Sequence, residues 1–169
     1  SNGYLFDISH VNSADFGVPQ KRRRLIVRAS RYLLPRIQPF NKTVGWKKSI
    51  EDLLPLLKQS EFAEWQIKIV EKRGSDGDIL VHGGNTTAGV VRFAEEPAFV
   101  VTANSSKTLH RARVGGNVKA IDVRCLARFQ SFPDCYIMPE NRILACTGIG
   151  NAVPPLMMQS LYSQFVDLN

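Results

Sequence analysis

Four consecutive basic residues, Lys21 to Arg24, run directly into the apolar stretch Leu25–Val27. A nuclear-address signal or a solvated charge run normally lies in polar, flexible sequence, whereas this run continues into a strand-like segment. Side chains alternate between the two faces of a strand. The faces predicted here are Gln20, Arg22 and Arg24 on one side, and Lys21, Arg23, Leu25 and Val27 on the other.

The face that carries Arg22 and Arg24 has two interpretations. Guanidinium groups offer a fixed fork of donors that matches a phosphate or the edge of a base. Burying two of them without partners would be unfavourable. The alternative is a charged strand end that faces solvent and has no binding role.

The sequence around this run predicts a hairpin. Residues 3–12 and 22–29 have strand-like patterns, and Gly17 and Pro19 lie in the turn between them. A two-stranded unit is only marginally stable by itself. We therefore expect other parts of this chain, or another chain, to cover it.

The remaining elements are predicted from capping residues, helix breakers and apolar spacing. Helices are expected from Ser49 through Leu57 with a kink at Pro55, from Ser60 to Gly74, from Asp122 through Gln130, and after Pro154. Short strands are expected at 79–81, 89–93 and 99–102, separated by irregular loops. The last helix should pack through a stripe formed by Met158, Leu161, Phe165 and Leu168.

The formal net charge of +7 is unevenly distributed. Residues 1–48 and 105–128 are strongly basic, and an acidic segment, 49–104, separates them. A basic face concentrates polyanions and steers their approach. Charge alone leaves two interpretations open, which are nucleic-acid binding and a simple contribution to solubility.

The sequence also excludes several classes of protein. No apolar run approaches the roughly 20 residues that span a bilayer, and the first residues do not resemble a signal peptide. We expect a cytoplasmic protein without membrane contact. Cys125, Cys135 and Cys146 form no C-x-x-C pair, so neither a disulfide framework nor a metal site is predicted.

Three motifs resemble those of the cytosine-C5 DNA methyltransferases, and they occur in that family's order. The stretch NSADFGVPQKRRRLIV, residues 12–27, resembles the Q-x-R-x-R motif; VRCLARFQSFPDCY, 123–136, is similar to the R-x-x-x-R-x-Q-x-F-P-D helix motif; and GIGNAVPP, 148–155, is similar to the G-N-A-V-P-P motif. The gap between the first two is where the family places its target-recognition domain. The resemblance, carried by residues 3–30 and 120–168, implies the C-terminal part of such an enzyme and allows it to be one subunit of a split enzyme.

The resemblance also implies roles for individual residues. Arg24 matches the arginine that holds the flipped cytosine, Arg22 its partner beside the catalytic pocket, and Gln20 a supporting group. Asn151 and Ala152 match residues that complete one edge of the S-adenosylmethionine pocket. The family's glycine-rich cofactor loop, Pro-Cys nucleophile and Glu-Asn-Val motif do not occur in these 169 residues. We therefore expect cofactor binding and activity only with a second polypeptide that supplies them.

Double-stranded DNA is the expected substrate, and the candidate contacts are basic residues. Those assigned to DNA are Lys21, Arg23, Lys107, Arg111, Arg113 and Arg128. Lys21 and Arg23 face either solvent or phosphates. The segment 105–116 is expected to be a flexible loop that reads guanine or contacts phosphates non-specifically. For Arg124 and Arg128 we favour a structural role over a phosphate contact.

These observations predict an α+β or α/β fragment. Residues 1–40 would supply the hairpin of a Rossmann-like methyltransferase sheet, 41–119 a small α+β target-recognition domain, and 120–169 the helices that return to the catalytic domain. The predicted function is recognition and base holding in methyl transfer to DNA cytosine, by family habit in restriction-modification. The alternative is a DNA-binding or regulatory module without catalysis.

Overall fold

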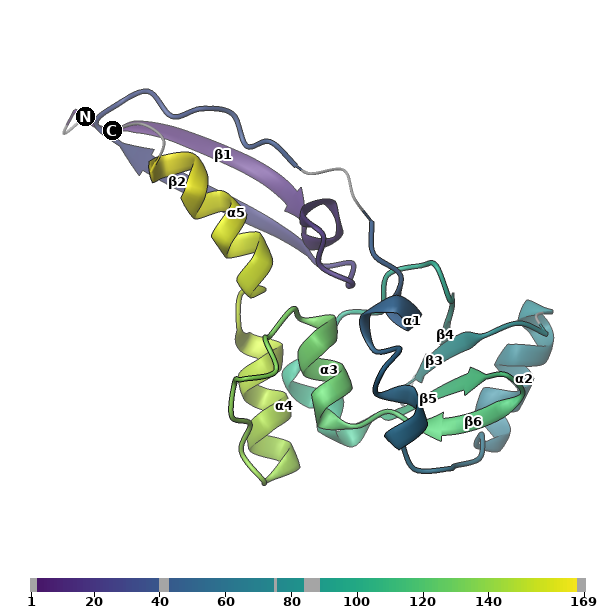
Figure 1. Cartoon of the computed structure of the whole chain (residues 1–169). Helices are drawn as coiled ribbons and strands as arrows, with labels where there is room; N and C mark the ends of the chain where they lie inside the picture. Colours follow the sequence, from purple (N-terminus) through teal and green to yellow (C-terminus); the bar gives the residue numbers. More distant parts are fainter. Residues whose placement is uncertain (1–2, 40–42, 75, 84–88, 167–169) are drawn as a thin grey trace.

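The computed structural model describes residues 3–39, 43–74, 76–83 and 89–166. The chain forms two parts (Figure 1). One is a hairpin of β1, Leu5–Asn12, and β2, Arg23–Ser30, with helix α5, Pro155–Val166, lying along it. The other is a larger mixed α and β part that holds the elements from residue 46 to residue 151. Both sheets within the described residues are antiparallel.

The predicted hairpin is confirmed. Its strands pair with Leu5 opposite Ser30 and Asn12 opposite Arg23. A 3-10 turn at Ser13–Phe16 joins them and ends at Gly17, whose φ of 76° is a left-handed conformation that favours glycine. Chain reversal is therefore built into the sequence between the two strands.

Helix α5 covers one face of the hairpin (Figure 1). The final helix was expected to pack through an apolar stripe, and the stripe that it uses differs from the predicted one. Met157 and Leu161 are buried against Val11 and Ile26. Met158 was assigned to the stripe and is instead 50% exposed. The stripe therefore starts at Met157 rather than Met158, and Met157 and Leu161, four residues apart, share one face of the helix. The side chain of Phe165, and Leu168 altogether, lie outside the described residues.

The larger part contains a four-stranded sheet in the order β4-β3-β5-β6. Its strands are β3 at Ile79–Gly83, β4 at Val90–Phe93, β5 at Leu109–Val114 and β6 at Asn117–Ala120. The first two were predicted. The strand expected at 99–102 is wrong, since those residues form no regular element and β5 and β6 complete the sheet instead.

The flexible loop expected at 105–116 is also wrong. These residues form a 3-10 turn, η3 at Ala103–Lys107, followed by β5 and the hairpin turn to β6. Gly115 and Gly116 both have positive φ in that turn, as two-residue hairpin loops require. In β5 the buried His110 and Ala112 alternate with half-buried arginines, which is a strand pattern. The sequence did not predict this strand because the charged residues made the stretch resemble a loop.

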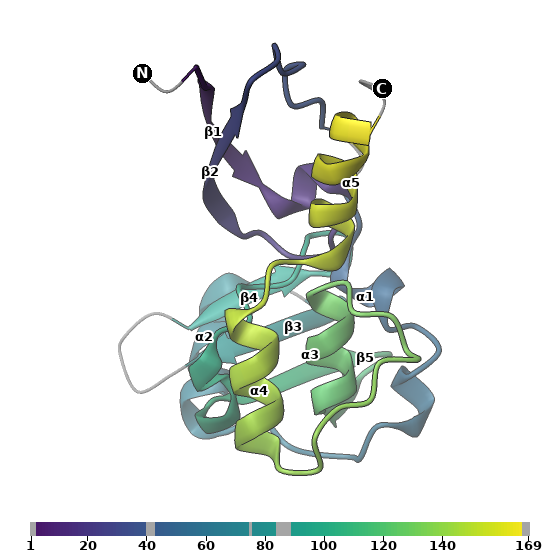
Figure 2. The ribbon, with the colours of Figure 1, turned by 90° about the vertical axis from the view of Figure 1, so that its left-hand side faces the viewer.

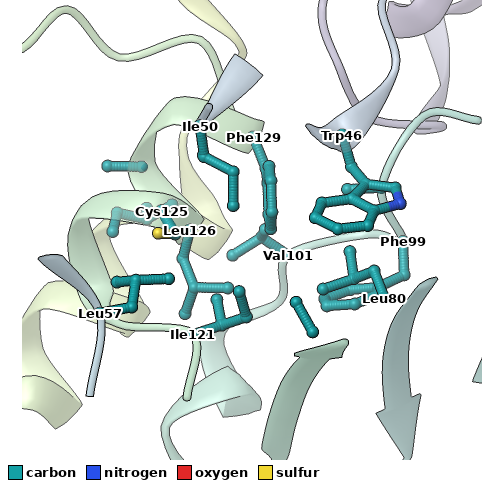
Figure 3. Close-up of a cluster of buried hydrophobic side chains, with 14 of the residues drawn as sticks. Trp46, Ile50, Leu57, Leu80, Phe99, Val101, Ile121, Cys125, Leu126 and Phe129 are labelled. Carbon is teal, nitrogen blue, oxygen red and sulfur yellow. The ribbon is translucent and has the colours of Figure 1, made fainter. Parts of the chain in front are cut away.

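Helices cover both faces of the sheet (Figure 2). Helix α2, Glu64–Arg73, packs on one face, and α1, Trp46–Ser49, lies over the other together with α3, Val123–Phe129. Helix α4, Arg142–Asn151, packs beside α3 and against η3. Figure 3 shows the core between them, where Phe99 meets Phe129 edge to face with ring centroids 6.2 Å apart.

Several predicted helix boundaries need correction. The helix expected from Ser49 to Leu57 is replaced by α1 and a 3-10 turn at Leu54–Leu56, because Pro55 prevents a continuous helix. Helix α2 begins after Ala63 rather than at Ser60, and it ends at Gly74 as expected. Asp122 caps α3 by accepting a hydrogen bond from the Cys125 amide at 2.8 Å, which confirms that prediction.

Helix α4 was not predicted, because two glycines interrupt its sequence. Gly150 explains why one of them is tolerated. A β-carbon at this position would lie 2.2 Å from the backbone nitrogen of Ala103. The missing side chain lets α4 approach η3 closely, and that approach outweighs the low helix propensity of glycine.

The buried His110 and the half-buried His82 beside it should make stability depend on pH. His82 Nδ1 lies 3.2 Å from His110 Nε2, and the His82 ring stacks on Phe99. Burial, followed by the nearby His82, lowers the pKa of His110 to about 3, and burial also lowers the pKa of His82. Within the described residues no group of three or more His, Cys, Asp or Glu side chains could hold a metal ion, and no helix could cross a membrane.

We expect the free energy of unfolding to fall as the pH decreases from about 6.5 towards 3. The unfolded chain takes up a proton in this range that the His110 imidazole does not accept, so His110 lowers the free energy of unfolding by about 1.4 kcal/mol per pH unit. The lowered pKa of His82 acts in the same direction. Urea unfolding of His110→Gln should show a shallower decline. His10→Gln, at an exposed position on β1, should follow the wild-type curve; identical curves for all three proteins would contradict the prediction.

Candidate functional site

Arg22 lies inside the molecule, where the hairpin meets the larger part. It is 5% exposed. Its Nη1 donates to the Val101 carbonyl at 2.9 Å, and its Nη2 donates to the carbonyls of Gly150 at 2.7 Å and Ala152 at 3.4 Å. Burial lowers the pKa of Arg22, and the positive charge of Arg24 lowers it further. Backbone carbonyls of its own chain therefore occupy this guanidinium, which suits a positioning role.

Arg24 is exposed, two residues further along β2. Its Nη1 donates a hydrogen bond to the neighbouring Arg23 carbonyl at 2.7 Å. It is two residues from Arg22 along the strand, so the two side chains leave the backbone on the same face. Arg24 thus presents donors to solvent from a strand that Arg22 anchors.

Gln20 is fully buried just before β2. Its Nε2 donates to the Phe129 carbonyl at 3.2 Å and to Gln130 Oε1, and its Oε1 accepts from the Val101 amide at 2.9 Å. Gln130 is also fully buried, and it had been assigned no role. The sequence did contain a signal for it, because it is the glutamine of the helix motif.

Asn151 and Ala152 stand at the end of α4, next to Arg22. Asn151 is exposed, while the Ala152 amide donates to the Gly148 carbonyl at 3.1 Å. The Ala152 carbonyl accepts hydrogen bonds from both Arg22 and Gln130. The polar groups of Ala152 are therefore engaged within the chain, and the Asn151 side chain remains as the polar group of this pair that a ligand could reach.

The other basic candidates occupy three separate places. Lys21 and Arg23 are exposed at the start of β2, and Lys107 is exposed at the end of η3. Arg111 and Arg113 project from one face of β5 and are half-buried, with Arg113 Nη2 donating to the Gly77 carbonyl at 3.1 Å. Burial and the charge of Arg142, which was not among the candidates, lower the pKa of Arg111.

Arg128 is held by two carboxylates. Its Nε lies 2.9 Å from Asp134 Oδ1, and its Nη2 lies 2.8 Å from Asp52 Oδ2. These hydrogen bonds raise the pKa of Arg128 and lower the pKa of both aspartates. Arg124 donates to the Tyr136 carbonyl at 3.0 Å. The geometry favours the structural alternative for both arginines over a phosphate contact.

Comparison with solved structures places this arrangement in the methyltransferase-like α/β folds. The structure of the Entamoeba histolytica methyltransferase EhMeth matches it with a TM-score of 0.61 at 14% identity, covering 99% of this chain and 55% of that chain. The chain belongs to the C-5 cytosine-specific DNA methylase family, whose model matches residues 1–167.

Curated relatives are similar over much of the chain. The type II methyltransferase M1.HphI of Haemophilus parahaemolyticus is 28% identical over 99% of this chain and 49% of its own length. M.AplI of Arthrospira platensis is 25% identical over 94% of this chain and 46% of its own length. This chain therefore spans about half the length of these relatives.

These matches correct one prediction. The resemblance had been placed at 3–30 and 120–168 and read as the C-terminal part of an enzyme, with a split subunit as one form of it. That assignment is contradicted, because the methylase family model runs through residues 1–167, middle segment included, and the M1.HphI alignment covers 99% of the chain. The chain matches the methylase family over residues 1–167.

Proposed function

We propose that these residues hold the target base and contact DNA in a cytosine-C5 DNA methyltransferase, which transfers a methyl group from S-adenosylmethionine to cytosine. The observation that carries the proposal is the contrast between two neighbouring guanidinium groups. Arg22 is buried and bound to backbone carbonyls, whereas Arg24 is exposed and available. A rigidly supported, accessible guanidinium suits a flipped nucleotide, whose extrusion from the duplex costs a few kcal/mol.

Arg24 performs the holding step. Its guanidinium donates to the extruded base or to the flanking phosphates, and its fixed charge favours the negative charge that develops on the ring during the reaction. Arg22 acts through Arg24 by fixing the start of β2, and Gln20 supports the loop before it. Lys21 and Arg23, exposed beside them, contact the phosphates of the same strand.

The cofactor contact lies at the end of α4. Because both backbone groups of Ala152 are engaged, the side chain of Asn151 makes the contact and Ala152 positions it. S-adenosylmethionine supplies the methyl group. These 169 residues contain no cysteine that follows a proline and no Glu-Asn-Val, so the nucleophile and the ring-activating glutamate come from residues outside them.

Residues 41–119 form the proposed DNA-reading unit, between the hairpin segment 1–40 and the closing segment 120–169. Lys107, Arg111 and Arg113 supply its candidate contacts. Because β5 holds the two arginines in a strand, they would present donors in a fixed register. Helices α3 and α4 share one hydrophobic core with this unit. If the hairpin with α5 moves relative to the larger part, the movement would therefore occur where the chain enters β2 and where it enters α5.

Methylation of double-stranded DNA tests the proposal. The protein that contains these residues with their native flanking sequence should transfer label from methyl-labelled S-adenosylmethionine to carbon 5 of cytosine. The 169 residues alone should bind DNA and transfer no methyl group. DNA binding without transfer in both proteins would support the alternative, a non-catalytic DNA-binding module, and label on another base atom would overturn the assignment.

A further inference from the structure

We propose that Gln20 and Gln130 form a positioning link that holds the strand carrying Arg24 and the turn carrying Asn151 in one fixed arrangement. The functional meaning of this link rests on the proposed function above. Its structural content is independent of that function. A substitution at Gln20 should change amide hydrogen exchange at residues 148–152, more than a hundred residues away in the sequence.

The hydrogen bonds fix the orientation of both side-chain amides. Gln20 Oε1 accepts from the Val101 amide, so its Nε2 points at two acceptors, the Phe129 carbonyl and Gln130 Oε1. Gln130 must then direct its own Nε2 away from Gln20. It donates there to the Ile149 carbonyl at 2.9 Å and to the Ala152 carbonyl at 2.8 Å.

The link closes on Arg22. The guanidinium of Arg22 donates to the Val101 carbonyl. The backbone amide of Val101 donates to Gln20 Oε1. At the other end Arg22 and Gln130 share the carbonyl of Ala152. Two side chains of one loop therefore reach the end of α4, one directly and one through Gln130. The side chains of Gln20, Arg22 and Gln130 are buried, so water competes little for their hydrogen bonds.

This arrangement places the two functional groups at opposite ends of one connected unit. Arg24 lies two residues beyond Arg22, and Asn151 directly precedes Ala152. If the end of α4 shifts when cofactor binds, Gln130 transmits that shift to Gln20 and the start of β2. Binding of S-adenosylmethionine and capture of the target base should therefore favour each other, and such coupling is reciprocal.

Hydrogen exchange tests the link without any ligand, in the full-length protein. In Gln20→Met, the Ala152 amide should exchange about fivefold faster, the effect of losing a hydrogen bond of ordinary strength. Gln66→Met is a matched control: Gln66 is fully buried and its Nε2 donates to the Leu109 carbonyl at 3.3 Å, but it lies on α2 outside the link. It should leave exchange at Ala152 unchanged.

A second variant covers the case in which Gln20→Met does not fold. Gln130→Glu keeps the acceptor for Gln20 and loses both donors to the turn, so it should also increase exchange at Ala152. Wild-type exchange at Ala152 in whichever of these variants folds would overturn the link. Equal acceleration in Gln66→Met would also overturn it, because the effect would then reflect general destabilisation.

A binding measurement tests the functional meaning. In the wild type, duplex DNA should tighten S-adenosylmethionine binding. The quantity to measure is the ratio of the S-adenosylmethionine dissociation constants without and with DNA, and Gln20→Met should bring this ratio about fivefold closer to one. Gln66→Met should keep the wild-type ratio. A wild type that binds both ligands with a ratio of one would overturn the coupling. A wild type that binds neither would refute the proposed function, and exchange at Ala152 would still decide the link.

Discussion

Arg24→Ala is expected to lower the rate of methyl transfer about 100- to 1000-fold, the usual effect of removing one preorganised donor from a reacting centre. The free energy of unfolding should change by less than about 0.5 kcal/mol, because the side chain is exposed and its recorded hydrogen bond is to the neighbouring Arg23 carbonyl. The measurement is single-turnover methylation of DNA by the full-length protein, together with urea unfolding of each variant.

Two further variants make this result specific to Arg24. Arg24→Lys keeps the charge but loses the planar fork of donors, so it should recover only part of the rate. Arg36→Ala removes an exposed arginine from the segment after β2 and should retain full activity. Wild-type turnover in Arg24→Ala would remove this residue from the mechanism, and an equal loss in Arg36→Ala would reduce its role to general charge.

The second large effect is expected at Arg22, on stability. Arg22→Met should lower the free energy of unfolding by about 2–4 kcal/mol, because the buried carbonyls of Val101 and Gly150 would each lose a charged donor. Methionine retains much of the apolar volume, so the loss would report on hydrogen bonding more than on packing. Urea denaturation with an unchanged slope is the measurement.

Arg24→Met provides the comparison for this change. It makes the same substitution two residues away, on the same strand, where the side chain is exposed. It should change stability by no more than about 0.5 kcal/mol. Wild-type stability in both methionine variants would show that the carbonyl contacts of Arg22 contribute little. A loss of stability at Arg24 as large as at Arg22 would mean that both guanidinium groups are structural.

The contrast between these arginines marks the limit of prediction from the sequence. Period-two alternation predicted correctly that β1 and β2 form a hairpin and that Arg22 alternates with Arg23. Nothing in that pattern distinguishes Arg22 from Arg24. The difference comes from the end of α4 and from Val101, which cover Arg22 and stop short of Arg24. Those contacts join residues about 80 to 130 positions apart.

The errors at β5 and η3 have a related cause. The polar and charged composition of 105–116 predicted a flexible loop, because exposed strands and loops share that composition. The neighbouring β3 supplies the hydrogen bonds that make 109–114 a strand, with His82 opposite His110. Pairing of this kind is decided by a partner strand rather than by local propensity.

The sequence by itself determined the family through its three ordered motifs, and with them the hairpin, the cap at Asp122 and the basic character of the chain. Local chemistry is sufficient for these features, because caps, turns and alternation act over a few residues. Only the tertiary structure decided which guanidinium is buried, that Arg128 is neutralised by two aspartates, and that Gln130 connects the hairpin to α4. Each of these depends on a buried hydrogen bond or ion pair whose partner lies far away in the chain.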